Sequence, residues 1–195
     1  LGLFSSFSPD MISITDFRTG GIEASSGDIT SSLMRIKSKS GKLMSSSWNL
    51  SLSPYMTSVY LETPGKKGKT DYRVAGRFSP LPLIAGIITG SDENYAKVHG
   101  LMHDWAATVE RRFNDKSVVK LTGLFSQDRL TAKYDNSGAI MQNISGMARL
   151  DFQSSLSNRT EFEVYGYCTF SKVLQNQDYY RGGKKNSSYS MSCDW

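Results

Sequence analysis

Hydrophobic and polar residues alternate along much of the chain, most clearly between Arg159 and Lys172. Successive side chains of a β-strand point to opposite faces, so this segment predicts a strand with one apolar and one polar face. The apolar face carries Phe162, Val164, Gly166, Cys168 and Phe170. The polar face carries Glu161, Glu163, Tyr165, Tyr167, Thr169 and Ser171.

The same pattern recurs in three other segments, where an aliphatic residue, a glycine and a phenylalanine share one face. These segments run from Ile144 to Phe152, from Val119 to Phe125 and from Tyr72 to Phe78. A glycine within a strand weakens a sheet in water, because it costs entropy and leaves no side chain to pack. It is better tolerated where the backbone bends or where lipid tails fill the gap. The glycines therefore indicate a sheet that closes on itself in a membrane.

The spacing of these segments sets the expected number of strands. A membrane-crossing strand with its turn takes roughly 13–16 residues, because a tilted strand needs about 9–11 residues to cross. The alternating segments and short turns of the 195-residue chain predict an all-β, antiparallel up-and-down meander. We expect a transmembrane β-barrel of about twelve strands, or part of a larger barrel. Residues 1–195 form a single domain, in which residues 1–30 are poorly patterned apart from a weak strand at Met11–Phe17.

Several individual elements follow from local signals. Leu83–Thr89 is apolar on both faces and predicts a strand buried on both sides. Asp104–Arg112 falls in a long predicted strand, with a helix as the alternative because it contains good helix formers. Gln127-Asp128 predicts a turn, Asn136-Ser137-Gly138 predicts a hairpin turn, and residues 175–186 read as a polar, basic loop.

Composition narrows the class of protein. Hydrophobic residues make up 38% of the chain and the mean hydropathy is −0.37, both low for a helical membrane protein. No segment approaches the ~20 apolar residues of a spanning helix, whereas a membrane barrel has one apolar face and an average that looks soluble. The net charge of +5 indicates either anionic partners or an ordinary basic surface.

The residues that carry chemistry form no recognisable catalytic or metal-binding arrangement. The two histidines, His99 and His103, have neither a nearby cysteine nor a supporting ligand pattern, so no metal or other cofactor is expected. No nucleophile, base and orienting group occur together, and the prediction is that the protein is not an enzyme. Cys168 and Cys193 form no CxxC motif, and two free, packed thiols are expected rather than a disulfide.

Two long segments resemble the mitochondrial outer-membrane porins, the family of the voltage-dependent anion channel and the translocase pore. The segments read YDNSGAIMQNISGMARLDF at 134–152 and TEFEVYGYCTFSKV at 160–173. The similarity is one of style over about residues 43 to 172, together with basic charge and short hairpins. That family's barrels have about nineteen strands, more than this chain supplies. The chain also lacks the family's glycine-containing C-terminal sorting signal. The aromatic Trp195 gives a second resemblance, to bacterial outer-membrane barrels.

The polar row is the predicted functional surface. In a barrel its charged side chains would line the lumen and set ion preference by their summed charge. On a soluble sheet they would form the solvated face. The candidate lining residues are Lys37, Arg73, Arg77, Lys120, Lys133, Arg149, Glu161 and Glu163. Six cations against two acids predict a preference for small anions.

Two functions remain open from the sequence. One is a pore or scaffold for small anions or polypeptides in an outer membrane, mitochondrial rather than bacterial. Its partners would be membrane lipid and other subunits of an assembly, and no nucleic acid is expected. The alternative is a soluble β-sandwich or barrel that binds an anionic partner through the basic tips Lys66-Lys67 and Lys184-Lys185. The two functions differ in whether the apolar row faces outward or into a core.

Overall fold

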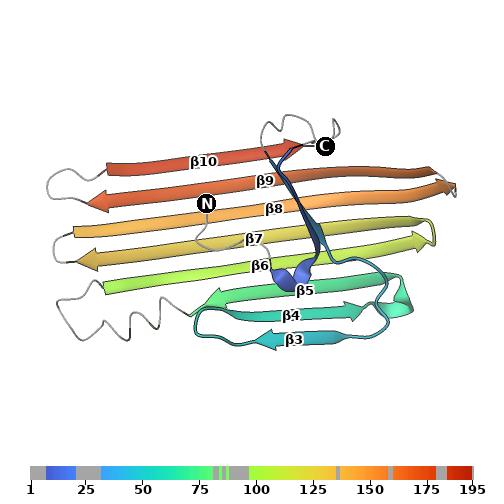
Figure 1. Cartoon of the computed structure of the whole chain (residues 1–195), viewed down its shortest axis with the longest axis horizontal. Coiled ribbons are helices and arrows are strands. Elements are labelled where there is room, and N and C mark those ends of the chain that lie inside the picture. The colour runs from blue at the N-terminus through green and yellow to red at the C-terminus, as the bar shows by residue number, and fades with distance from the viewer. Residues whose placement is uncertain are drawn as a thin grey trace.

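A large antiparallel sheet and a small separate one make up the described part of the protein (Figure 1). The computed structural model describes residues 8–20, 32–80, 84, 87, 97–134, 137–157, 160–178 and 184–194. Eight strands form the large sheet and two form the small one. The predicted all-β, antiparallel class is therefore confirmed.

The large sheet is an open meander in which each strand lies beside its neighbour in the sequence. Its strands are β3 (Ser47–Ser51), β4 (Thr57–Pro64), β5 (Thr70–Ser79), β6 (Lys97–Asn114), β7 (Ser117–Tyr134), β8 (Ser137–Ser157), β9 (Thr160–Asp178) and β10 (Lys184–Asp194). In the described part, β3 pairs only with β4 and β10 pairs only with β9. The predicted meander is confirmed, but the sheet is not closed into a barrel and the described strands number ten.

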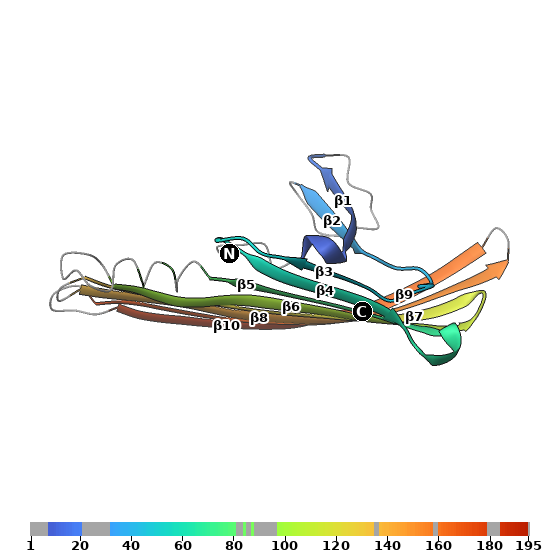
Figure 2. The same cartoon turned by 90° about the horizontal axis from the view of Figure 1, so that it is seen from below.

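The N-terminal part of the chain stands over one face of this sheet, as Figure 2 shows. It contains the short helix η1 (Pro9–Met11) and a hairpin of β1 (Ile12–Arg18) and β2 (Leu33–Ser38). Met11 of η1 packs with Tyr60, Ala75 and Ala106 in a small buried cluster on the sheet. The weak strand predicted at Met11–Phe17 corresponds to β1.

The central strands are longer than the local signals predicted. β7 has 18 residues and β8 has 21. The predicted turn at Gln127-Asp128 is wrong, because these residues continue β7 and pair with β6 and β8. The helix alternative for Asp104–Arg112 is also wrong, because this segment lies within β6. Hydrogen-bonding partners on both sides override the local turn and helix preferences.

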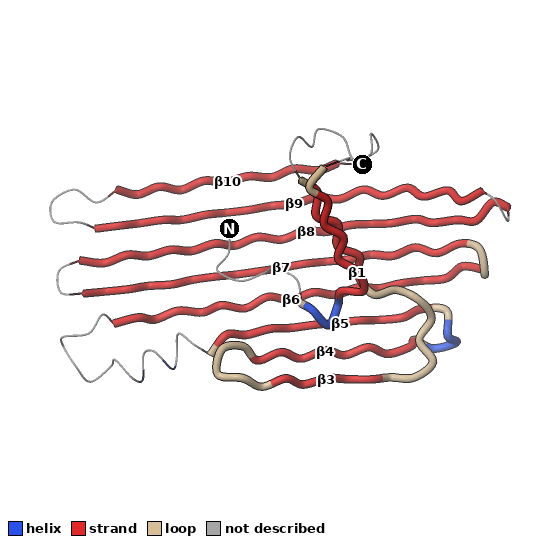
Figure 3. The backbone as a smooth tube through the Cα atoms, in the orientation of Figure 1, coloured by secondary structure: helices blue, strands red, loops and turns tan. Residues whose placement is uncertain are grey.

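The turns follow the sequence more closely. Tyr134 pairs with Ser137, so β7 and β8 form a hairpin as predicted, and Figure 3 shows the two strands side by side. The predicted turn residues Ser137 and Gly138 belong to β8 instead. The basic tip between β4 and β5 contains the short helix η3 (Lys66–Gly68). Of the strand predicted at residues 83–89, only Ile84 and Ile87 are described, and both are helical. The rest of that prediction lies outside the described residues. The loop predicted at 175–186 is shorter than expected, because β9 continues to Asp178 and β10 begins at Lys184.

The cysteines differ from the expectation of free thiols. Cys168 is disulfide-bonded, and Cys193 is its register partner across β9 and β10. The sequence carries no sign of the Cys168 disulfide, because the register of two strands is set by the whole ladder and not by the spacing of two residues.

Aromatic rings explain two of the strand glycines. Gly76 lies opposite Trp105 and Gly146 lies opposite Phe170, and in each pair the ring covers the glycine backbone. A Cβ atom added at either glycine would overlap the ring. At Gly123, by contrast, an added Cβ would meet nothing within 4 Å. Gly76 and Gly146 therefore make room for cross-strand rings.

Replacing these glycines by alanine should separate the two situations. We expect Gly146→Ala to displace the Phe170 ring and to lower the free energy of unfolding by about 1 kcal/mol or more, as overpacked sites do. Gly123→Ala is the matched control and should be neutral or stabilising by up to about 1 kcal/mol, because alanine loses less backbone entropy. Urea unfolding of the two purified variants measures the difference. Equal effects would show that the ring contact does not constrain position 146.

Candidate functional site

The two faces of the large sheet differ in chemistry and in exposure. Strand register places the four apolar rows found in the sequence on the same face. Several of their large side chains are exposed: Leu121 is 50%, Leu150 52% and Val164 49% accessible. The opposite face carries charged residues, yet Asp71 is 0%, Arg73 2% and Glu110 3% accessible. The arrangement is the inverse of an ordinary soluble sheet, which buries its apolar face.

The exposed side chains form a band across the sheet, which we call the apolar band. One border is a register row that contains Trp105, Phe125 and Phe170. Near the other border, Phe152 and Phe162 contact each other edge to face, with ring centroids 6.4 Å apart. The rows between them are mainly aliphatic residues and glycines. Beyond the Trp105 row, the same face carries Gln127, Arg129 and Lys172.

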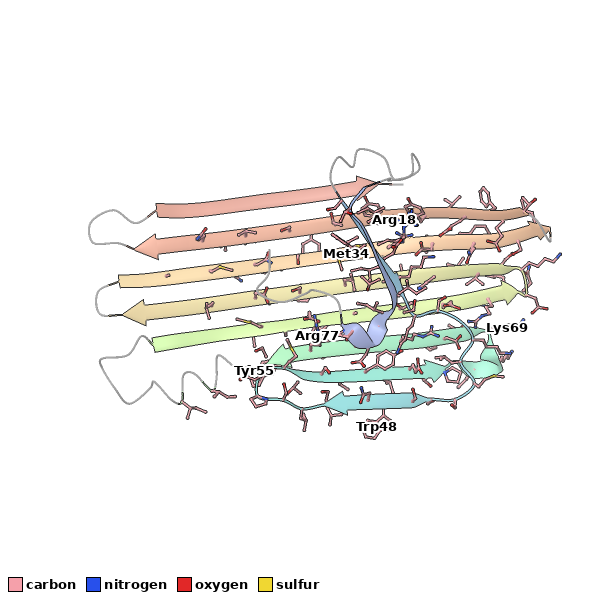
Figure 4. The ribbon with its side chains drawn as sticks, viewed as in Figure 1. Arg18, Met34, Trp48, Tyr55, Lys69 and Arg77 are labelled. Atoms are coloured by element: carbon pink, nitrogen blue, oxygen red, sulfur yellow. The ribbon has the colours of Figure 1, made fainter. Side chains whose placement is uncertain are left out.

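Part of the polar face is covered by the segment that follows β2 (Figures 2 and 4). The Nζ atom of Lys120 donates to the carbonyl oxygens of Ser38 (3.3 Å) and Lys39 (3.4 Å). The backbone N–H of Leu43 donates to Asp71 Oδ2 over 3.2 Å. Side chains of β5 and β7 thus bind backbone groups of a segment distant in sequence and hold it against the sheet.

Arg73 is the centre of this network. Its Nη2 donates to the carbonyl oxygen of Gly41 over 2.6 Å. Its guanidinium also lies 3.6 Å from Glu62 and 3.7 Å from Glu110. Glu110 in turn accepts from the backbone N–H of Gly41 at 3.2 Å. Arg73 and Glu110 therefore bind both polar groups of the Gly41 backbone.

Three further arginines form ion pairs on the polar face. Arg112 bridges Glu110 and Asp71, with 2.6 Å to Asp71. Arg77 donates two hydrogen bonds of 2.8 Å to Asp104, and its position on β5 is labelled in Figure 4. Arg149 pairs with Asp151, and its guanidinium lies 4.3 Å from the Tyr165 ring centroid.

Six of the eight lining residues predicted from the sequence lie on one face of the large sheet. Register places Arg73, Arg77, Lys120, Arg149, Glu161 and Glu163 on the polar face. Lys37 lies elsewhere, exposed on β2 in the small sheet. The backbone of Lys133 pairs in register with Lys97. Position 133 has the same alternation as Leu121 of the apolar band and not that of the polar face, and the Lys133 side chain lies outside the described part.

The sequence prediction omitted several acids that follow the same alternation. Among the described side chains of β4–β9, register places five cations on the polar face, namely Arg73, Arg77, Arg112, Lys120 and Arg149. The acids in phase with them number eight, namely Glu62, Asp71, Asp104, Glu110, Asp128, Asp151, Glu161 and Glu163. Most of these acids alternate with apolar residues, so the signal was present in the sequence. Among these described strand residues, acids therefore outnumber cations eight to five.

Asp128 lies on β7 beyond the aromatic border of the apolar band. Burial raises the pKa of its carboxyl above the ordinary value, and the nearby Asp104 carboxylate raises that pKa further. The His103 side chain acts in the opposite direction. Asp128 is an acid of the polar face, and none of the ion pairs between described residues involves it.

Other kinds of site find little support in the described residues. They contain no cluster of three or more His, Cys, Asp and Glu side chains that could hold a metal ion. Within the same residues, no helix has the length and apolar character needed to cross a membrane. No protein-family model, no curated protein and no solved structure matches this chain. The function must therefore be argued from the two faces of the sheet.

Removing Arg77 tests how strongly the polar face depends on its buried ion pairs. Arg77→Met leaves the Asp104 carboxylate, whose side chain is 11% accessible, without its bidentate partner. We expect a loss of about 3–5 kcal/mol in the free energy of unfolding. Arg149→Met removes a pair whose arginine is 35% accessible and should cost about 1 kcal/mol.

A double variant provides the control. Arg77→Met combined with Asp104→Leu removes both charges and should recover much of the lost stability, because no unpaired charge stays buried. Chemical unfolding of the three variants measures these differences. A double variant no more stable than Arg77→Met would contradict the electrostatic explanation.

Proposed function

We propose that this chain is a membrane-embedded β-sheet protein of an outer membrane, where it forms the wall of a barrel that acts as a pore or scaffold. The observation that supports the proposal is the apolar band, which is exposed on one face while charged side chains are buried on the other. In a membrane this arrangement is favourable, because lipid covers the apolar face and the polar face turns inward.

The size of the apolar band fits a bilayer. On β9 it extends from Phe162 to Phe170, which is nine residues. At about 3.3 Å per residue these span roughly 30 Å along the strand. A strand tilt of about 35–45° reduces the height to roughly 21–25 Å, close to the ~25 Å apolar band of membrane barrels. Polar and charged residues such as Gln127 and Lys172 follow beyond it on the same face.

The soluble binding module is less well supported. A soluble sheet would bury Leu121 and Leu150 in a core and leave charged residues such as Arg73 and Glu110 to water. The observed exposures are the opposite. The basic tip Lys66-Lys67 lies in a turn at the end of β4, where it fits a solvated loop at a membrane surface as readily as an anion-binding site.

The polar face favours a scaffold or a cation-preferring interior over the anion pore expected from the sequence. Among its described strand residues, acids outnumber cations eight to five. Fixed charge of one sign favours mobile ions of the other. Residues 38–43 are also bound to this face through Lys120, Arg73 and Asp71, so part of the interior is already filled. Placement in the mitochondrial rather than the bacterial outer membrane rests on the sequence resemblance alone.

An arginine in the apolar band should impair membrane insertion. We expect Leu121→Arg to destabilise the inserted protein by about 2–4 kcal/mol, the cost of a cation facing lipid near the bilayer midplane. Gln127→Arg changes the same face of the same strand beyond the aromatic border, so it should have little effect. Folding into liposomes, monitored as a function of urea, measures both. If Leu121→Arg inserts as well as Gln127→Arg, the apolar band does not face lipid.

The charge of the polar face predicts the sign of any ion selectivity. In planar bilayers under a salt gradient, the reversal potential should indicate cation preference. Glu161→Gln and Glu163→Gln together should reduce that preference, because both acids lie on the polar face and are exposed. Anion preference would contradict this assignment of the interior. Absence of conductance would leave the scaffold role.

A further inference from the structure

The two edge strands are the part of the sheet that a membrane cannot accommodate. In the described part, the outer sides of β3 and β10 have no strand neighbour. Each unpaired backbone N–H or C=O group costs several kcal/mol in the hydrocarbon region, so an open edge does not persist in contact with lipid. If the sheet is embedded as proposed above, both edges need partners.

The direction of the strands determines which edges can pair. Eight strands alternate in direction across the sheet, so β3 and β10 run in opposite directions. When two copies have the same orientation in a membrane, β10 of one copy is antiparallel to β3 of the other. Each copy then offers one edge of each kind, and two copies satisfy all four edges.

A single copy cannot close on itself in its observed state. A barrel of eight strands has an interior just wide enough for side chains. Here the polar face also carries η1, whose Met11 packs against Tyr60, Ala75 and Ala106. It carries the backbone around Gly41, bound by Arg73 and Glu110. Closure around this material requires more strands than the eight of the described sheet.

The apolar band reaches both edges. Trp48 and Leu50 of β3 are 73% and 51% accessible and pair with Leu61 and Val59, so they continue the band to the β3 edge. At the other edge, Met191 of β10 is the register partner of Phe170, whose exposed ring belongs to the band. Joining β10 to β3 therefore extends one continuous apolar band.

We propose that two copies of this chain close a single barrel, with β10 of each copy hydrogen-bonded to β3 of the other. Two sheets of eight strands give a sixteen-stranded wall, a size that leaves room for more than side chains. The five residues of β3 limit each seam, so the pairing depends on the membrane, where unpaired backbone groups are most costly. This inference rests on the proposed membrane function.

The experiment blocks one edge at a time in the full chain. Proline has no N–H group to donate, and adjacent residues of an antiparallel edge strand point their N–H groups alternately inward and outward. Asn49→Pro and Leu50→Pro form such a pair on β3, and Ser187→Pro and Ser188→Pro form one on β10. Far-UV circular dichroism identifies the member of each pair that keeps the sheet, which is the one that blocks only the outer edge.

Native mass spectrometry of protein released from lipid nanodiscs then counts the chains in each particle. We expect two chains for the unmodified protein and no two-chain particles for either edge-blocked variant alone. Mixing the β3-blocked and β10-blocked variants should restore two-chain particles, because one intact seam remains.

Three results would overturn the inference. A single chain for the unmodified protein in lipid would do so while leaving the membrane proposal in place. Two chains for the β3-blocked variant alone would show that the copies join through some other edge. A protein that does not enter nanodiscs at all would reject the membrane proposal together with this one.

Discussion

The contact between Arg73 and the Gly41 backbone is the interaction on which the rest of the structure depends. The guanidinium is buried on the sheet, bonded to the Gly41 carbonyl and flanked by Glu62 and Glu110. Leaving such a charge buried without partners costs several kcal/mol. The network therefore fixes the N-terminal segment on the polar face. It also joins β5 and β6 to the Gly41 backbone, which is 32 residues from Arg73 and 69 from Glu110 in sequence.

This coverage decides the environment of the opposite face. Because the segment after β2 covers part of the polar face, the apolar band is left outward. Aliphatic residues and glycines lie between its two aromatic borders. Trp105 and Phe170 mark one border, and Phe152 and Phe162 lie near the other. The glycines fit this face, since Gly76 and Gly146 lie beneath rings that are themselves exposed. One alternation of residues thus accounts for the covered polar face and for the exposed apolar face, which suits contact with lipid.

The sequence predicted the faces well and the connections poorly. Residues such as Phe162, Val164 and Arg73 lie on the faces that alternation predicts, because strand geometry imposes a period of two. The sequence did not predict that β7 continues through Gln127-Asp128, or that Cys168 forms a disulfide. Both features depend on which strands become neighbours. The charge balance was misjudged for a different reason. Acids such as Asp71 and Glu110 follow the same alternation as the cations, but the predicted set of lining residues does not include them.

Quenching of Trp105 by brominated lipids tests the central claim most directly. The chain has three tryptophans, and replacing Trp48 and Trp195 by phenylalanine leaves Trp105, which is 51% accessible at the border of the apolar band. Reconstitution in lipids brominated along the acyl chain should quench its fluorescence strongly, whereas a water-soluble quencher should have little effect. The reverse result, with quenching from water and none from lipid, would show that the apolar band is not in contact with the membrane.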